Sequence, residues 1–428
     1  MINALSAIAA LLLAAAILLV GNGLQATLLS VRGGIEGFPT PVIGALMACY
    51  FTGYILGCRF NPQFIKSVGH IRTFVALASI ASASALTHPF IVNEIAWGLL
   101  RGVTGFCFAG LVMIIESWLN ERATNADRGR IMSTYRVVDL SATVTGNALL
   151  ATASPEGFEL FALTSIMISI ALVPVALTRS PAPQPIATAR LNIPKLFKVS
   201  RVAAVGAAAT GLANSSFWAL GPVYAQQLGY PKAVIAAFMS CVVIGAALLQ
   251  WPIGWLSDKV DRRIVMVGSG VLGVAAALAL SHFGAKGEAY LLGIGAAFGA
   301  FIIPMFGLNA AHANDHAEPG SAVETNGGLL LLHASGAVIG SFAGGFAMSA
   351  YGPSAIFVYI AVIYSAFCVF ALARILTREA PVADEKTPFS PVPRSASPAV
   401  FEIAEDDPNE ERSAQNAPSE RAASAADV

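Results

Sequence analysis

The sequence predicts an all-α membrane protein with twelve transmembrane helices in two pseudo-symmetric six-helix bundles, and three observations carry this prediction. Of the 428 residues, 56% are apolar and only 12% are charged, whereas soluble domains carry roughly 25% charged residues. The apolar residues fall into twelve runs, and a basic joint separates the first six runs from the last six. This composition excludes an ordinary soluble enzyme, and a net charge of zero excludes the basic surface of a nucleic-acid-binding protein.

Each apolar run is long enough to cross a bilayer, whose hydrocarbon core needs roughly 20 residues of helix. Buried helices of a large soluble protein would look similar one at a time, but the short joints between the runs leave little room for that alternative. The first run has no Lys or Arg before it and is too long for a signal peptide, so we interpret it as an uncleaved span. The twelve predicted spans are 5–30, 42–58, 73–92, 95–118, 132–151, 159–177, 202–226, 233–253, 264–283, 289–310, 328–350 and 353–376.

The placement of Lys and Arg predicts the orientation of these spans. If the N-terminus is cytoplasmic, the cytoplasmic joints before the tail contain 14 basic residues, and the outer joints contain only Arg32, Lys232 and Lys286. Cytoplasmic loops of membrane proteins are enriched in Lys and Arg. We therefore expect a protein integral to the bacterial cytoplasmic (inner) membrane, with both termini cytoplasmic.

Composition also predicts four parts of the chain. Residues 1–178 form the N-terminal six-helix bundle and residues 202–377 the C-terminal one. Between them, residues 179–201 form a basic cytoplasmic linker with five basic residues, no acidic residue and four prolines. Residues 378–428 form a disordered acidic cytoplasmic tail, because residues 379–428, with 11 acidic and 4 basic residues among Pro, Ser and Ala, cannot bury enough apolar surface to fold.

The joint after the eighth span carries the most specific motif, GWLSDKVDRR, from Gly254 to Arg263. It resembles the G-x-L-a-D-R-x-G-R-R signature of the major facilitator superfamily, although Asp261 stands where Gly is usual. The matching residues that the resemblance places in a gating loop are Gly254, Asp258, Lys259, Arg262 and Arg263. The corresponding joint after the second span, PQFIKSVGHIR, has Lys66 where the family has Asp.

The fourth span resembles the same family, because Arg101 and Gly105 match its R-x-x-x-G pattern. The order of motifs along residues 1 to about 377 resembles the YcaD-like branch of bacterial members. The resemblance implies the major facilitator fold and a secondary active transporter that moves a small solute by rocker-switch alternating access. No nucleotide-binding loop is present, so we expect protons to drive transport. The alternative is a non-transporting membrane receptor or scaffold on the same fold, which the altered first loop favours.

Four charged residues in predicted spans are candidates for coupling or substrate binding, because charge inside a membrane is costly. Arg101 binds an anionic group or takes part in proton coupling, or else it bonds to helix carbonyls as a structural arginine. Glu116, Arg136 and Asp139 should lie at a similar depth near the cytoplasmic mouth, with Arg136 and Asp139 on one helix face. They form either a static clamp between the fourth and fifth spans or a gate that titrates.

Polar residues at helical spacing mark possible faces of a central cavity. Interhelical hydrogen bonding is the alternative for all of them. Gly336, Gly340 and Gly344 repeat every four residues, which favours close helix packing over a binding site. The polar candidates for the cavity are Asn22, Gln25, Asn214, Trp218, Asn309 and His333.

No catalytic motif appears, so we expect neither an enzyme nor a cofactor. His312 and His316 flank Asp315, but we expect a solvated loop there rather than a metal site. The expected partners are a small-molecule solute, protons and the lipid bilayer, without nucleic acid, and the expected state is a monomer.

The charge bias generates a topological prediction. Reporter fusions after Leu177 and after Arg378 should both report a cytoplasmic location, because the basic residues concentrate on that side. A periplasmic signal at either fusion would contradict the topology.

Overall fold

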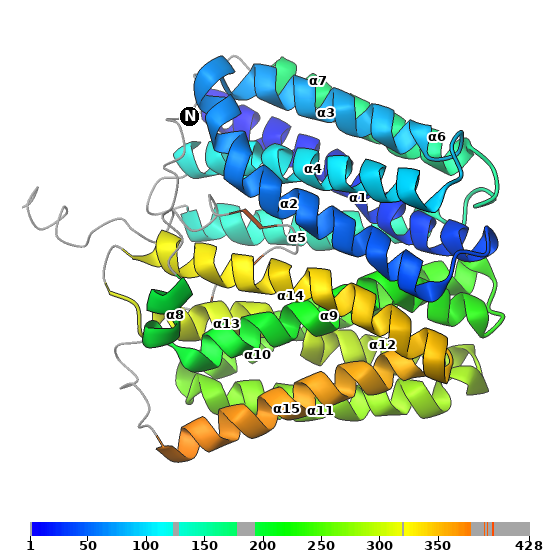
Figure 1. Ribbon diagram of the computed structural model, residues 1–428. Coiled ribbons are helices and arrows are strands. Elements are labelled where there is room, and N and C mark those ends of the chain that lie inside the picture. Colours follow the sequence, from blue (N-terminus) through cyan, green and yellow to red (C-terminus); the bar gives the residue numbers. More distant parts are fainter. Residues whose placement is uncertain are drawn as a thin grey trace, which may run out of the picture.

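The computed structural model describes residues 2–122, 128–177, 193–318 and 321–377, together with residues 389, 392, 396 and 397. Every regular element in this part of the chain is a helix, and the helices run side by side in two groups (Figure 1). The predicted linker falls largely outside the described residues, and only its end is seen, as helix α8. Apart from the four residues named above, the predicted tail also lies outside them.

The first group comprises helices α1 to α7. Helices α6 and α7 follow one another closely and together form one apolar stretch, Glu159–Ala176. The helices are α1 (Ile2–Ile35), α2 (Thr40–Val68), α3 (His70–Thr87), α4 (Glu94–Arg122), α5 (Arg128–Leu149), α6 (Glu159–Ile170) and α7 (Leu172–Ala176).

The second group comprises helices α8 to α15. Helix α8 meets α9 at a bend of 118°, and the Ser200 side chain at this bend caps α9 by accepting a hydrogen bond from the Ala203 N–H. The elements are α8 (Ile193–Val199), α9 (Arg201–Gln227), α10 (Lys232–Lys259), α11 (Arg262–Phe283), the 3₁₀ turn η1 (Gly284–Lys286), α12 (Glu288–Ile302), α13 (Met305–Asn314), α14 (Ala322–Tyr351) and α15 (Ala355–Thr377).

Nine stretches of the described chain are long and apolar enough to cross a membrane, or ten if α8 and α9 count as one. The predicted spans 73–92 and 132–151 lie largely in α3 and α5, which are helical but outside that set. The all-helical membrane fold is thus confirmed, whereas the count of twelve spans stays a prediction. Large apolar side chains on the outer faces agree with lipid contact: Leu99, Leu248 and Val369 are each about 70% exposed.

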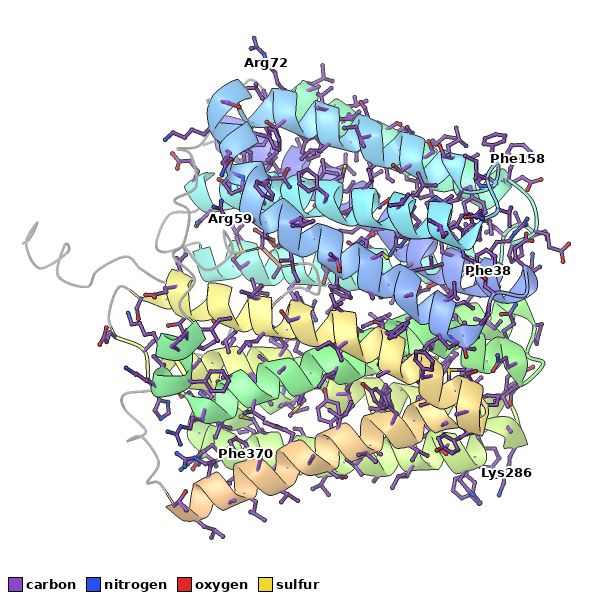
Figure 2. The ribbon with its side chains drawn as sticks, in the orientation of Figure 1. Phe38, Arg59, Arg72, Phe158, Lys286 and Phe370 are labelled. Atoms are coloured by element: carbon purple, nitrogen blue, oxygen red, sulfur yellow. The ribbon has the colours of Figure 1, made fainter. Side chains whose placement is uncertain are left out.

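The two ends of the helix bundle differ in charge. Arg59 and Arg72 lie at one end, and Phe38, Phe158 and Lys286 lie at the other (Figure 2). We call the first the basic end and the second the opposite end. The motif at the end of α10 belongs to the basic end.

Each half contains a reciprocal glycine contact between two helices. In the first half, a Cβ atom at Gly53 of α2 would overlap the Gly102 carbonyl of α4, and one at Gly105 would overlap the Tyr50 carbonyl. In the second half, Gly245 of α10 meets the Ala296 carbonyl of α12, and Gly299 meets the Val242 carbonyl. The spacing of three residues is identical on all four helices. The two halves therefore repeat the same packing, as expected of a duplicated bundle.

A second reciprocal contact repeats in the same way. Gly146 of α5 packs on the Val20 carbonyl and Leu24 nitrogen of α1, and Gly336 of α14 packs on the Ala208 carbonyl and Leu212 nitrogen of α9. These pairs align α1 with α9 and α5 with α14. The α2–α10 alignment, extended toward the basic end, places Lys66 at the position of Asp258. The structural repeat therefore supports the correspondence that the sequence predicted for the two loops.

The two halves contact each other closely toward the opposite end. The Thr40 hydroxyl at the start of α2 donates to the Gly345 carbonyl of α14 at 3.0 Å, and the Gln226 amide of α9 donates to the Val31 carbonyl of α1 at 3.0 Å. Lys232 at the start of α10 donates to the Ala153 carbonyl at 2.6 Å. This end is closed in the present conformation.

The glycine packing generates a stability prediction. A Cβ atom at Gly340 would overlap the Leu212 carbonyl of α9, whereas one at Gly293 of α12 would meet nothing within 4 Å. Gly340→Ala should therefore lower the free energy of unfolding by about 1–3 kcal/mol, the usual cost of overpacking. Thermal unfolding of the purified protein in detergent measures this cost. Gly293→Ala is the matched control, and equal melting temperatures for the two variants would contradict the packing.

Candidate functional site

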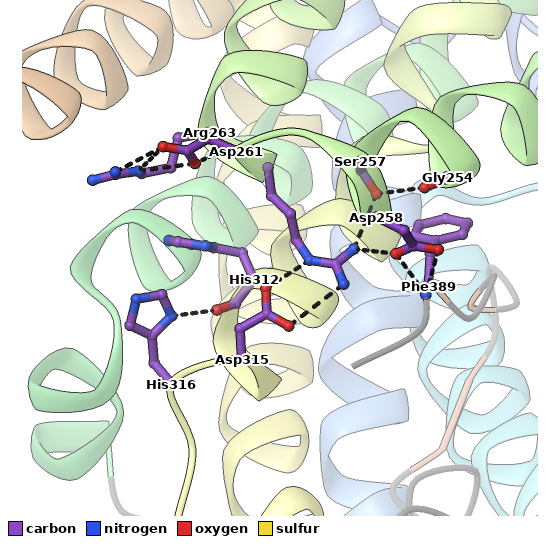
Figure 3. A network of polar contacts seen from close by, with 10 residues as sticks. Gly254, Ser257, Asp258, Asp261, Arg263, His312, Asp315, His316 and Phe389 are labelled. Atoms are coloured by element: carbon purple, nitrogen blue, oxygen red, sulfur yellow. Dashed lines mark hydrogen bonds and ion pairs between the residues drawn. The ribbon is translucent and has the colours of Figure 1, made fainter. Parts of the chain in front are cut away.

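The predicted gating loop is a compact polar network at the basic end (Figure 3). Arg262, whose side chain is only 1% exposed, lies between two carboxylates: its Nη1 is 2.9 Å from Asp258, and its Nε is 2.7 Å from Asp315 at the end of α13. Its Nη1 also donates to the Ser257 hydroxyl at 3.0 Å. The network thus joins the α10–α11 connection to α13 through one buried guanidinium.

Asp261 and Arg263 form a second unit of the same loop. The Asp261 carboxylate caps α11 by accepting from the Arg263 N–H at 2.9 Å, and it is 2.7 Å from the Arg263 guanidinium. Burial acts to raise the pKa of Asp261, but the hydrogen bonds and charge of Arg263 outweigh it and hold the pKa below its usual value. Asp261, where the family usually has Gly, is therefore used as a helix cap.

The expectation of a solvated loop around Asp315 is wrong. Asp315 is 1% exposed at its side chain because it pairs with Arg262, and His312 is 4% exposed within α13. The partner of Asp315 is Arg262 at the start of α11, 53 residues earlier in the chain, and local sequence carries no signal for that contact. Lys259, in contrast, lies over the ring of Trp255, with its Nζ 3.8 Å from the ring centroid.

Asp258 also contacts the C-terminal segment. Both of its carboxylate oxygens accept from the Phe389 N–H, at 3.0 and 3.3 Å, and the Phe389 ring covers Gly254 so closely that a Cβ atom there would overlap it. In the present conformation, with the opposite end closed, Asp258 is bonded both to Arg262 and to Phe389.

The predicted cluster of Glu116, Arg136 and Asp139 divides into two sites. Arg136 and Asp139 of α5 form the expected pair, with 2.5 Å between nitrogen and oxygen, and both are 3% exposed. Arg136 also donates to the Gln250 side chain of α10 at 3.0 and 3.3 Å. This bond joins the two halves. The only signal for it in the sequence is that Gln250 is an isolated polar residue in an apolar run.

The hydrogen bonds of Glu116 are made with residues other than Arg136 and Asp139. Glu116 is fully buried in α4, and its Oε2 accepts from the Ser397 N–H at 2.9 Å and from the Ser397 hydroxyl at 2.5 Å. The Tyr135 hydroxyl is also close enough to interact with this carboxylate. Among the residues that the structure describes, no basic side chain forms an ion pair with Glu116. Counted along the helix, it lies about 9 Å from the end of α4.

Arg101 and Gln25 are the other buried polar groups of the first half. The Arg101 guanidinium lies 4.4 Å from the Tyr50 ring centroid, and its Nη2 is 3.9 Å from the Met47 sulfur. Gln25 is fully buried in α1, and neither amide atom has a hydrogen-bond partner among the described residues. A buried amide without a partner is costly, so Gln25 is a good candidate for contact with a solute. Its neighbour Asn22 is also buried.

The polar candidates of the second half bond mainly within their own half. Asn214 accepts from the Tyr364 hydroxyl at 3.2 Å, and Asn309 donates to the Thr210 hydroxyl at 3.3 Å. The His333 ring packs edge-on against Phe306, and the Trp218 ring against Phe217. For Asn214 and Asn309, this arrangement favours the interhelical alternative over a cavity role. The stripe of Gly336, Gly340 and Gly344 packs α14 against α9 and neighbouring α15.

The site also contains residues that the sequence did not single out: Tyr54, Tyr135, Gln250, Phe389, Ala396 and Ser397. The Tyr54 hydroxyl donates to the Ala396 carbonyl at 3.2 Å, next to the bonds of Glu116. Among the described residues, no group of three His, Cys, Asp or Glu side chains has an arrangement that could hold a metal ion.

Comparisons with known proteins agree with this architecture. The chain matches the Major Facilitator Superfamily profile over residues 11–322 and again over 203–408. An MFS-type transporter of Salmonella typhi, YcaD, is 26% identical over 347 residues, which cover 81% of this chain and 90% of the relative.

Two solved structures share the fold. The nucleoside transporter NupG has a TM-score of 0.73 at 12% identity, covering 86% of this chain and 98% of that one. A bacterial homologue of the human lysosomal transporter Spinster, in an inward-facing and occupied conformation, has a TM-score of 0.69 at 15% identity, covering 87% and 98%.

The Arg262 network generates a prediction. Arg262→Met removes the cation and leaves Asp315 buried without its partner, so it should lower the free energy of unfolding by about 3–5 kcal/mol. Unfolding in a detergent titration measures this loss, and Lys259→Met, at an exposed position, should change stability by no more than about 0.5 kcal/mol. The double variant Arg262→Met/Asp315→Asn should recover part of the loss. Equal stability of Arg262→Met and the parent would contradict the network.

Proposed function

Because the chain belongs to the Major Facilitator Superfamily and is an integral inner-membrane secondary transporter, we propose that it moves a small solute by proton-coupled alternating access. Two six-helix bundles rock about a site between them, both termini are cytoplasmic, and the basic end faces the cytoplasm. The protein acts as a monomer and carries out no chemical step on its cargo. The solute is small and amphipathic or neutral, since the few buried charges largely pair with one another.

One observation carries the coupling proposal: Glu116 is fully buried in α4, where it bonds to Ser397, and has no ion-pair partner among the described residues. An ionised carboxylate is costly to bury unless it is paired. Asp139 already has such a partner in Arg136. We call the space between the basic ends of the two halves the vestibule. Glu116 is therefore the carboxylate whose charge depends most on what else occupies the vestibule, as a coupling residue requires.

The conformation supports an access route from the basic end to this carboxylate. The contacts near Thr40, Gln226 and Lys232 close the opposite end. Ser397, which follows the last helix and belongs to none of them, nevertheless reaches Glu116. A passage that admits a peptide chain also admits a small solute, as an inward-facing state requires.

The structural repeat supports the proposal that the first half supplies the polar residues of the site. In the alignments given by the glycine contacts, Arg101 corresponds to Gly295, Glu116 to Ala310 and Asp139 to Leu329. The second half thus has uncharged residues at these positions. We propose that Gln25 and Arg101 contact the solute. The second half forms the facing, uncharged side of the site and moves relative to the first half during transport.

The alternative function, a receptor or scaffold without transport, rests on the first loop. Lys66 occupies the position of Asp258 and is exposed, so that loop lacks the acid that binds Arg262 in the second half. A single functional loop, the one after α10, is enough for the rocking motion if the contacts of that loop differ between the inward-facing and outward-facing conformations. The presence or absence of flux decides between the two functions.

A flux assay tests the coupling role. Purified protein in proteoliposomes, given a panel of labelled solutes and an imposed proton gradient, should accumulate one of them. Glu116→Gln should abolish gradient-driven accumulation but retain exchange of solute across the membrane, because it carries no titratable proton. Glu121→Gln, at an exposed position of the same helix, is the control and should accumulate solute like the parent. Accumulation by Glu116→Gln at the parent's rate would refute the coupling role, and no flux for any solute would favour the receptor.

A further inference from the structure

Four residues that follow the last helix lie against the basic ends of both halves: Phe389, Val392, Ala396 and Ser397, here called the tail segment. Ala396 is 3% exposed and Ser397 is fully buried. Such burial is unusual in a region with the composition of a solvated tail. The tail segment therefore has a binding site in the rest of the protein.

The first half binds the last two residues of the tail segment, Ala396 and Ser397. Glu116 of α4 accepts from both the N–H and the hydroxyl of Ser397, and the Tyr54 hydroxyl of α2 donates to the Ala396 carbonyl. A carboxylate that accepts two hydrogen bonds and a phenol that donates one together recognise a peptide backbone with a short hydroxyl side chain. Hydrogen bonds to a charged group are stronger than those between neutral groups.

The second half binds the first two residues of the tail segment, Phe389 and Val392. Asp258 accepts from the Phe389 N–H, and the ring of Phe389 covers Gly254, as Figure 3 shows. Val392 packs on a small apolar cluster that includes Leu196 of α8 and Leu329 of α14. Gly254 is suited to this role because any side chain there would displace the ring.

Charge and chain length both favour binding within the molecule. Residues 379–428 contain 11 acidic and 4 basic residues, and the joints at the basic end are rich in Lys and Arg, so the two attract one another. Eleven residues lie between Thr377 and Phe389, and the twelve steps along an extended chain reach about 40 Å. A short tether produces an effective concentration on the order of millimolar, so even a weak site is mostly filled.

We propose that the tail segment is a built-in ligand of the vestibule, which holds the basic end open and occludes Glu116 until it leaves. Rocking would bring the basic ends of the halves together, and the segment bonded to both of them stands in the way. The same bonds occupy the carboxylate assigned above to coupling. Occupancy of the site does not depend on transport, but the inhibitory consequence rests on the proposed function.

Cross-linking tests the occupancy directly. In a cysteine-free background with a protease site inserted in the linker, Tyr54→Cys is combined with Ala396→Cys and treated with a short bismaleimide. Ser67→Cys, exposed at the end of the same helix, replaces Tyr54→Cys in the control pair. If the tail segment is bound, the pair with the buried position 54 cross-links faster. If the tail is free in solution, the exposed position 67 reacts at least as fast, and the proposal fails.

Accessibility provides a second measurement that does not depend on the cross-link. Tyr54→Cys in nanodiscs is labelled with a hydrophilic maleimide. Truncation after Arg378, or Ser397→Pro, which removes both donors to Glu116, should raise the labelling rate about tenfold if nine-tenths of the molecules are occupied. Ser413→Pro, further along the same region, should leave the rate unchanged. Equal labelling of the parent and the truncated protein would overturn the proposal.

Flux then separates the two proposals. If the truncated protein labels faster and transports faster than the parent, the tail segment is inhibitory. If it labels faster but shows no flux with any solute of the panel, the binding site stands and the transport proposal falls. Faster labelling with flux equal to the parent's would refute the inhibitory role alone.

Discussion

Close backbone contact at glycine is the constraint on which the rest of this structure depends. Apolar side chains gain little by leaving lipid for another helix, so helices in a membrane associate where small residues let their backbones meet. Gly53 with Gly105 and Gly245 with Gly299 lock the same pair of helices in each half. The same two helices are thereby held in the same close contact in each half, and Gly44 and Gly345 make contacts of this kind between the halves.

The surfaces between the halves are built differently at the two ends. Toward the opposite end, backbone carbonyls accept bonds from Thr40, Gln226 and Lys232, without buried charge on the accepting side. Nearer the basic end, Arg136 of the first half donates a hydrogen bond to Gln250 of the second half. The charge of Arg136 is balanced by Asp139. A neutral amide facing a paired guanidinium can separate without leaving an isolated charge in the membrane, which lowers the cost of opening and closing.

The two acidic residues that bind the tail segment, Asp258 and Glu116, have different surroundings. The departure of the segment therefore affects them differently. Asp258 is about one-third exposed and shares Arg262 with Asp315, so losing Phe389 leaves it paired. Glu116 is fully buried, and among the described residues its closest partners are Ser397 and Tyr135. Departure of the tail segment would admit water to Glu116 and change the cost of its charge. Regulation and coupling would then act on the same atom.

Features that depend on neighbours along the chain were predictable. Apolar runs specify helices, the motif from Gly254 to Arg263 specifies a charged turn, and three-residue spacing puts Arg136 beside Asp139. The glycine stripe on α14 was read correctly as packing because its period is that of one helix face. These signals are local, and the family resemblance they carry is confirmed by the matching profile.

The partners of the buried charges were decided by tertiary structure. Arg262 meets Asp315 53 residues away, Arg136 meets Gln250 at 114, and Glu116 meets Ser397 at 281. No periodicity links such positions, because the helices that bring them together are ordered by packing rather than by sequence distance. A tail whose composition predicts only solvation has a bound segment for the same reason: a few backbone donors and one ring suffice once the two halves have formed their site.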